Sequence, residues 1–206
     1  FDPTLKAWYK FNETSWSGEF GDVLDTIGNN PAQSKNGVTQ SVKLDTDKAA
    51  SFDGIDDNIA TPIKFLSTGS LSLSAWVKTG IQNKKRMTVI GGTNGGPFEM
   101  YVTNGKPACR AWTTEKDYTI ISSSMIDSQW HHILCVQDYS TGQTRLYVDG
   151  ALSKQIPRIA ASAGGSFSIG KPGSTLASYF NGLIDNARIY DKAFTDAEVL
   201  ALFGEG

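Results

Sequence analysis

One carboxylate in the sequence stands where an apolar side chain is expected. Leu183, Asp185, Ala187 and Ile189 occupy alternate positions, and alternate side chains of a β-strand share one face. We therefore predict that Asp185 faces the interior, where a carboxylate costs several kcal/mol unless it is paired or bound to a metal. A hard cation such as calcium is the preferred interpretation. Two structural alternatives remain, namely Arg188 or backbone N–H groups as partners, and a β-bulge that returns Asp185 to solvent.

Other oxygen-bearing residues come from loops far away in the sequence. Asp25 and Asn30 lie in a glycine-bearing turn, and Asp53 ends a predicted strand at Gly54, whose carbonyl suits a hard cation. Calcium takes six to eight oxygens from carboxylates, carbonyls and water. These residues supply that mixture, although Asp, Asn and Gly are also ordinary turn residues.

Aromatic residues in polar surroundings are the candidate ligand-binding side chains. Trp16 lies in a serine-rich stretch, Arg110 and Trp112 lie near Tyr118, and Tyr179 ends a loop rich in glycine and serine. Aromatic faces stack on the C–H patches of sugars while polar neighbours bond to hydroxyls. The alternative is that each aromatic ring covers an end of the fold. Trp8, Trp76 and Trp130 lie inside predicted strands and are assigned to the core.

No strand carries paired carboxylates in an apolar setting, as a glycosidase would need. His131 and His132 are adjacent on a predicted strand, so their side chains point to opposite faces and cannot serve one site. We therefore predict a protein that is not an enzyme. A polysaccharide lyase or glycoside hydrolase built from scattered residues such as Arg110, His131 and Tyr118 is the alternative.

Composition limits the class of protein further. The formal net charge of −2 argues against nucleic-acid binding, and no apolar run reaches the length that membrane insertion needs. Hydrophobic residues make up 39% of the 206 residues, which is enough for a sizeable core. Cys109 and Cys135 are either a disulfide pair or two buried thiols.

Short strands separated by turns must position these side chains. Residues 71–78 alternate apolar and polar side chains, as do residues 144–148, and Asp149-Gly150 predicts a tight hairpin to residues 151–156. Residues 133–136 and 167–169 are predicted buried strands, and Gly91-Gly92 and Gly95-Gly96 are predicted turns. Many short strands with glycine turns indicate a sandwich or barrel.

One short helix is predicted near the end of the chain. Thr195 and Glu198 form a capping box, and Phe194 and Val199 can form a hydrophobic staple. Gly204 is placed for a left-handed C-terminal cap.

Several segments in order resemble the laminin-G-like, concanavalin-A-like family in its bacterial jelly-roll branch. They are residues 5–11 with 25–30, 49–59, 73–78, 130–133 with 146–150, and 180–190. Each motif alone is weak, but the ordered set spans nearly the whole chain.

This resemblance implies an all-β, two-sheet antiparallel jelly-roll sandwich over residues 1–206 as one domain, with the short C-terminal helix. It further implies a rim calcium site held by the N-terminal segment, the loop at Asp53-Gly54 and Asp185. The expected protein is a secreted bacterial module, extracellular or at the cell surface. It would be part of a larger multidomain protein and would bind a glycan. The alternative is a cell-surface protein partner, as in pilus assembly or adhesion. The fold alone does not fix the ligand.

Overall fold

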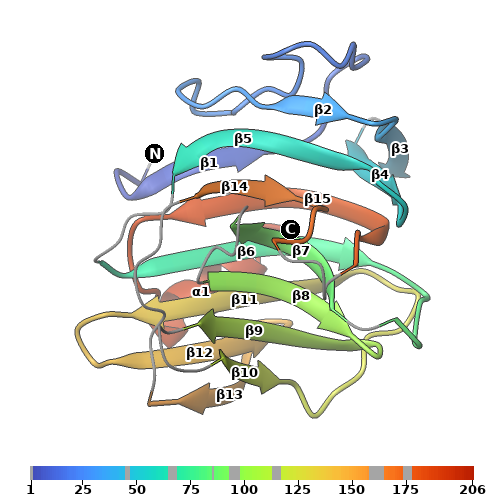
Figure 1. The fold of residues 1–206 in the computed structure, drawn as a ribbon. Helices are drawn as coiled ribbons and strands as arrows, with labels where there is room; N and C mark the ends of the chain where they lie inside the picture. Colours follow the sequence, from blue (N-terminus) through green and yellow to red (C-terminus); the bar gives the residue numbers. More distant parts are fainter. Residues whose placement is uncertain are drawn as a thin grey trace.

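Two antiparallel β-sheets lie face to face in the computed structural model (Figure 1). The structure describes residues 2–44, 47–64, 69–84, 86–92, 98–112, 117–157, 165–173 and 178–206. The eight-stranded sheet contains β1 (Leu5–Tyr9), β3 (Thr39–Leu44), β4 (Asp47–Asp53), β6 (Leu71–Lys78), β11 (His131–Asp138), β12 (Gln143–Val148), β13 (Ala151–Ile156) and β15 (Asn181–Tyr190). The seven-stranded sheet contains β2 (Gln33–Lys35), β5 (Asn58–Lys64), β7 (Met87–Gly92), β8 (Phe98–Thr103), β9 (Lys106–Trp112), β10 (Asp117–Ile121) and β14 (Ser166–Ile169).

Strand order places distant segments side by side. The eight-stranded sheet runs β13-β12-β11-β6-β15-β4-β3, and β1 also pairs with β15. The seven-stranded sheet runs β10-β9-β8-β7-β14-β5-β2. Consecutive strands in the chain therefore often belong to different sheets, as in a jelly roll, and the predicted all-β sandwich is confirmed.

The predicted hairpin at Asp149-Gly150 is confirmed. Both residues have positive φ angles, 50° and 77°, which is the geometry that joins β12 tightly to β13. The predicted turn at Gly91-Gly92 is wrong, because both residues lie in β7. A Cβ at Gly91 would approach the Cγ of Glu99 to 3.0 Å, so the glycine makes room for that side chain across the strand pair. Gly95-Gly96 lies outside the described residues.

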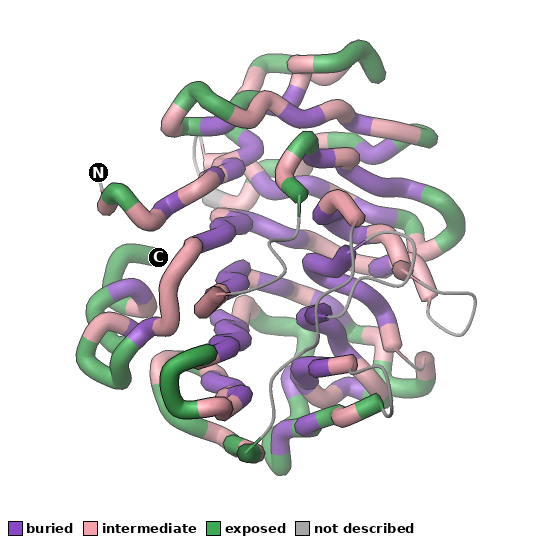
Figure 2. Tube along the Cα trace, turned by 60° about the vertical axis from the view of Figure 1, so that its left-hand side comes forward, coloured by how far each residue is buried: buried purple, intermediate pink, exposed green. Residues whose placement is uncertain are grey.

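The main core fills the space between the sheets. Apolar side chains from the inner faces pack there, and Figure 2 shows buried segments running through the middle of both sheets. A second, smaller cluster lies on the outer face of the eight-stranded sheet, where α1 (Asp196–Phe203) packs through Val199 and Leu202. In the described part of the chain α1 is the only helix, and none is long and apolar enough to cross a membrane.

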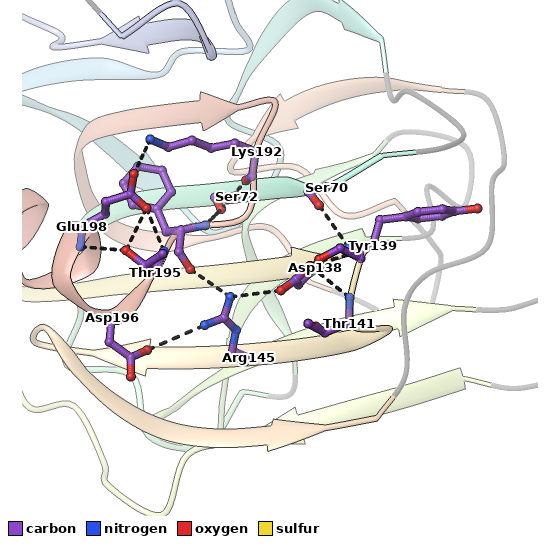
Figure 3. Close-up of polar contacts among 12 residues, drawn as sticks. Ser70, Ser72, Asp138, Tyr139, Thr141, Arg145, Lys192, Thr195, Asp196 and Glu198 are labelled. Atoms are coloured by element: carbon purple, nitrogen blue, oxygen red, sulfur yellow. Dashed lines mark hydrogen bonds and ion pairs between the residues drawn. The ribbon is translucent and has the colours of Figure 1, made fainter.

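The predicted capping box of α1 is present, since Thr195 Oγ1 accepts from the N–H of Glu198 and the Glu198 carboxylate accepts from the N–H of Thr195. Figure 3 shows Arg145 on β12 reaching from the strand to this end of the helix. Its guanidinium donates to the carbonyl of Phe194 (2.8 Å) and lies 3.6 Å from Asp196. The predicted left-handed cap at Gly204 is wrong. Gly204 has φ −71°, and its N–H still donates to the carbonyl of Leu200.

Three tryptophans assigned to the core lie elsewhere. Trp76 alternates with core residues of β6, and its cross-strand partners are Asp185 and His132, so these three side chains share the outer face of the eight-stranded sheet. Trp8 packs on the outer cluster, and Trp130 is partly exposed. The core assignment is therefore wrong for all three. Strand alternation turns Trp8 and Trp76 outward, and Trp130 precedes β11 and lies outside any strand.

Cys109 on β9 and Cys135 on β11 form a disulfide, which decides the alternative that the sequence left open. The bond joins the two sheets through the middle of the core, where both residues are fully buried.

Removing the disulfide should reduce stability without changing the fold. The bond closes a loop with a sequence separation of 26 residues, and the loss of that constraint on the unfolded chain costs about 3–4 kcal/mol. Urea unfolding of the Cys109→Ala/Cys135→Ala variant should show this decrease in the free energy of unfolding. An unchanged unfolding midpoint would contradict a formed bond.

Candidate functional site

Strict alternation along β15 fails at Asn186. Ile184, Ala187 and Ile189 all contribute to the main core, and the pairing of β15 with β6 shifts register between Asp185 and Arg188. Asn186 has φ 48°, so a β-bulge occupies this point of the strand. The prediction that Asp185 shares the core face is therefore wrong. Asp185 and Arg188 both point away from the core, on the outer face of the eight-stranded sheet.

Asp185 is nevertheless completely buried. Its Oδ2 lies 2.8 Å from Lys43 Nζ, and its Oδ1 accepts from the N–H of Asn186 at 2.6 Å. Burial raises the pKa of the Asp185 carboxyl, and the hydrogen bond and charge of Lys43 act in the opposite direction. One of the predicted alternatives to a cation is a partner from the protein itself, and Asp185 has such a partner. The partner is Lys43, whereas the sequence suggests Arg188.

Asp25 and Asn30 contact each other in the loop that precedes β2. The Asp25 carboxylate accepts hydrogen bonds from the backbone N–H groups of Trp8, Ile27, Asn29 and Asn30 at 2.9–3.2 Å. The Asn30 amide donates to the carbonyl of Lys6. Four donors occupy about all the lone-pair sites of a carboxylate. Asp25 therefore stabilises the backbone of this turn and has little capacity left to bind a cation.

Asp53 is the last residue of β4, as predicted, and Gly54 begins the turn to β5. Two further carboxylates, Asp56 and Asp57, lie in this turn. Oxygens of Asp53, Asp56 and Asp57 lie within 4.8 Å of one another. Asp57 is only 4% exposed. Burial, together with the charges of Asp53 and Asp56, raises the pKa of its carboxyl.

The five predicted metal ligands fall into three separate groups. Asn181 is the cross-strand partner of Asp53, and Asp185 lies four residues further along the same strand. At about 3.3 Å per residue, Asp53 and Asp185 are therefore about 13 Å apart, which is too far for them to share one ion. Among the predicted ligands, only the group around Asp53 gathers several carboxylates.

Trp16 lines a cleft of about 330 Å³ at the β3 end of the sandwich. The ring packs edge-on against Phe11 of the core, with 5.9 Å between ring centroids, and its Nε1 donates to Glu13. Gln40 and Lys48, which also line this cleft, donate to the backbone carbonyl of Glu13. The polar side chains around Trp16 are thus held in place before any ligand arrives.

Arg110 and Trp112 lie together on β9. They alternate with Cys109 and Ala111, which face the core, so both point outward from the seven-stranded sheet. Arg110 Nε donates to Asp117 at 2.7 Å. Its cross-strand neighbour Glu99 is 2% exposed and is bonded by Arg86 and Thr88.

Tyr118 and Tyr179 do not join one platform with the other aromatic candidates. Tyr118 pairs with the core residue Ala111, so it points toward the inner side of the sheet. Tyr179 is partly exposed and follows Ser178, which bridges to Met87 on β7. The cleft of Trp16 lies at the end of the sandwich where β3 and β2 are the edge strands, and β2 is five strand spacings, or about 24 Å, from β9.

Arg110 and His131, two residues of the alternative enzyme hypothesis, do not converge. His131 pairs with the core residue Val77 of the eight-stranded sheet and contacts Asp149 (2.8 Å) and Asp127 (3.2 Å). Arg110 points outward from the other sheet. His132 is buried on the opposite face from His131 and bonds to Ser74, as expected for a structural histidine.

The comparisons with known proteins give the family. Residues 52–200 match the family described as the concanavalin A-like lectin/glucanases superfamily, and the chain belongs to this family. Among curated proteins no sequence matches the chain.

Solved structures share the fold at low sequence identity. Domain 4 of AbnA, a GH43 extracellular arabinanase from Geobacillus stearothermophilus solved in complex with arabinotriose, is 23% identical with a TM-score of 0.74. The match covers 97% of this chain and 98% of that domain. The receptor-binding domain of a botulinum neurotoxin C/D mosaic serotype is 13% identical, with a TM-score of 0.74. There the match covers all of this chain and 52% of the other. The binding domain of Paraclostridial Mosquitocidal Protein 1 is 16% identical, with a TM-score of 0.72 and coverage of 97% and 52%. The chain thus spans about half of the two toxin domains.

Replacing Lys43 should expose the cost of the buried carboxylate. Lys43→Met leaves Asp185 buried without its ion-pair partner, which should decrease the free energy of unfolding by about 3–5 kcal/mol at neutral pH. Burial would then raise the folded-state pKa of Asp185 further above its unfolded value. The loss of stability should therefore be absent at pH values below the unfolded-state pKa of Asp185. It should grow as the pH rises toward the folded-state pKa of Asp185 in the variant.

The matched control is Lys43→Met/Asp185→Asn, which removes both charges and should recover most of the lost stability. Urea unfolding of the wild type, both single variants and the double variant measures the coupling. Additive effects of the two substitutions would contradict a direct ion pair.

Proposed function

We propose that this chain is a carbohydrate-binding module that holds its glycan in the Trp16 cleft. The observation that carries the proposal is the arrangement of an indole ring with prepositioned Gln40 and Lys48 side chains in one open cleft of about 330 Å³. A ligand site of this kind combines an apolar wall with a few fixed polar groups. Membership of a lectin-containing superfamily supports the same function.

Arabino-oligosaccharides are the first ligands to test, because a similar domain was solved with arabinotriose. A neutral glycan array that includes them should give binders, whose affinity is then measured by calorimetry. Trp16→Ala should weaken that binding about tenfold, since it removes the stacking surface.

The control is Phe20→Ala, which removes a ring that is 67% exposed in the same segment but outside the cleft. It should bind the glycan as the wild type does. Equal binding by wild type and Trp16→Ala would contradict this site.

A protein ligand is the second candidate function. Ile121, Met125 and Leu152 are exposed apolar side chains, and the hydrogen bond between Ser122 and Ser153 brings their segments together at the β10–β13 end. Exposed apolar side chains that cluster in this way favour a protein interface. Two results together would favour this function. No glycan would bind, and the chain would capture a purified surface or pilus protein that the Leu152→Glu variant fails to capture.

Calcium is part of the proposal, at the turn between β4 and β5. The chemistry of the donor set supports this position, because Asp53, Asp56 and Asp57 offer carboxylate oxygens close together, as calcium requires. We further propose that the protein is exported, as a secreted or cell-surface bacterial module of a larger protein. The Cys109–Cys135 disulfide supports an oxidising compartment.

Calcium should raise the melting temperature if this turn binds it. At a hundredfold excess over the dissociation constant, binding adds about 2.7 kcal/mol, or about 5–10 °C for a domain of this size. Thermal unfolding in calcium and in EDTA measures the difference. Asp57→Asn should abolish it, whereas the exposed Asp127→Asn should not. Identical melting curves in calcium and EDTA would contradict the site.

A further inference from the structure

A second cleft, larger than the Trp16 cleft, lies on the outer face of the eight-stranded sheet. Its volume is about 460 Å³, and its lining includes Trp8, Lys10, Lys43, Asn186 and Arg188. The two clefts have no lining residue in common, so the outer cleft and the Trp16 cleft are separate.

Three cations converge on this outer cleft, and aromatic rings hold them. Lys10 Nζ lies 4.1 Å and the Arg188 guanidinium carbon 4.0 Å from the centroid of Trp8. Lys43 Nζ lies 5.2 Å from the centroid of Trp130. Cation–π contacts at these distances fix long side chains that would otherwise sample many rotamers. The cleft therefore holds three cations in a defined arrangement, together with the carboxylates of Asp47 and Glu205.

The bulge in β15 fixes the floor of the outer cleft. The Asn186 amide accepts from Trp8 Nε1 at 2.8 Å and donates to Asp185 at 3.1 Å. Asn186 has φ 48°, a left-handed conformation that asparagine adopts more readily than most residues. Trp8 is thus held in place by the residue that forms the bulge.

Arg188 has binding capacity that the fold does not use. Its side chain is only 7% exposed, and its buried Nε has no hydrogen-bond partner among the described residues. A buried donor without a partner is costly. The partner of its Nη1, at 2.6 Å, is the carboxylate of Glu205, whose side chain is 56% exposed and lies beyond the end of α1. Arg188 is thus paired with a carboxylate of the protein itself. Because Glu205 is largely exposed, an external anion can displace it from Arg188.

We propose that the outer cleft binds an acidic saccharide, with the sugar carboxylate taken by Arg188 in place of Glu205. Lys10 supplies the second positive charge. Lys43 is neutralised by Asp185 and Asp47, so it shapes the cleft rather than binding the anion. Lys10 and Arg188 cover the Trp8 ring, so the sugar is recognised by hydrogen bonding. The exposed Asn12 amide at the rim bonds to Asp47 through one N–H and has a second N–H for a sugar hydroxyl, and this favours a saccharide over an acidic peptide. This second site is independent of the Trp16 cleft.

Calorimetry with tri-galacturonate, its methyl ester and sialyllactose tests the proposal. At least one of the two acidic saccharides should bind, and the tighter of them identifies the kind of sugar acid. The methyl ester of tri-galacturonate, which has lost its charge, should bind at least tenfold more weakly than the acid. Affinity for the acid should also fall as the salt concentration rises.

Two variants test the residues without replacing the buried Arg188. Lys10→Gln should weaken binding of the acid by about two- to fivefold, and Glu205→Gln should strengthen it by a similar factor, because the competing carboxylate is gone. Trp16→Ala should leave acid binding unchanged, which separates this site from the neutral-glycan cleft.

Four results would overturn the proposal. They are absence of binding by both acids, equal binding of acid and ester, unchanged affinity in both Lys10→Gln and Glu205→Gln, and loss of acid binding in Trp16→Ala. A poly-glutamate peptide that binds as tightly as tri-galacturonate would show that the cleft selects charge alone, and would overturn the saccharide assignment.

Discussion

The bulge at Asn186 is the constraint on which the outer surface of this protein depends. β15 pairs with β1, β4 and β6, so a change of register within it affects the middle of the eight-stranded sheet. One extra residue lets Ile184, Ala187 and Ile189 all reach the core. The same residue turns Asp185 and Arg188 outward. Without it, either the core would contain a carboxylate or half of the strand would lose its packing.

The position of Asp185 then determines where charged and aromatic side chains lie on the neighbouring strands. The buried carboxylate pairs with Lys43 from β3, 142 residues earlier in the sequence. Lys43 in turn lies against Trp76 and Trp130, and Asn186 holds Trp8. The outer cleft is therefore a consequence of satisfying one carboxylate, rather than a separate feature of the surface.

Local patterns in the sequence predict most of the fold. Alternation places β6 correctly, Asp149-Gly150 gives the hairpin, and the Thr195–Glu198 capping box starts the helix. Each depends on interactions between residues close in the chain, so short segments suffice. The prediction of a left-handed cap at Gly204 fails because the backbone keeps right-handed geometry at the end of α1. The prediction of a turn at Gly91 fails because space for the Glu99 side chain, rather than turn formation, requires a glycine there.

The candidate sites are less predictable, because they depend on pairs distant in the sequence. Trp16 stands out by its polar neighbours and does line a cleft. Lys10 and Trp8 could have been assigned outward, since they alternate with the apolar residues Ala7, Tyr9 and Phe11. Strict alternation past Asn186 gave the wrong face for Asp185, and nothing local to Lys43 indicates its partner. A bulge that shifts the register by one residue leaves only a weak signal in a single sequence.

The pKa of Asp185, followed by carboxyl-carbon NMR in the wild type and in Lys43→Met, tests this account most directly. Burial should hold the wild-type pKa above that of an ordinary aspartate, and loss of Lys43 should raise it further. An ordinary aspartate pKa that is the same in both proteins would mean that the carboxylate is neither buried nor paired, and would contradict the account.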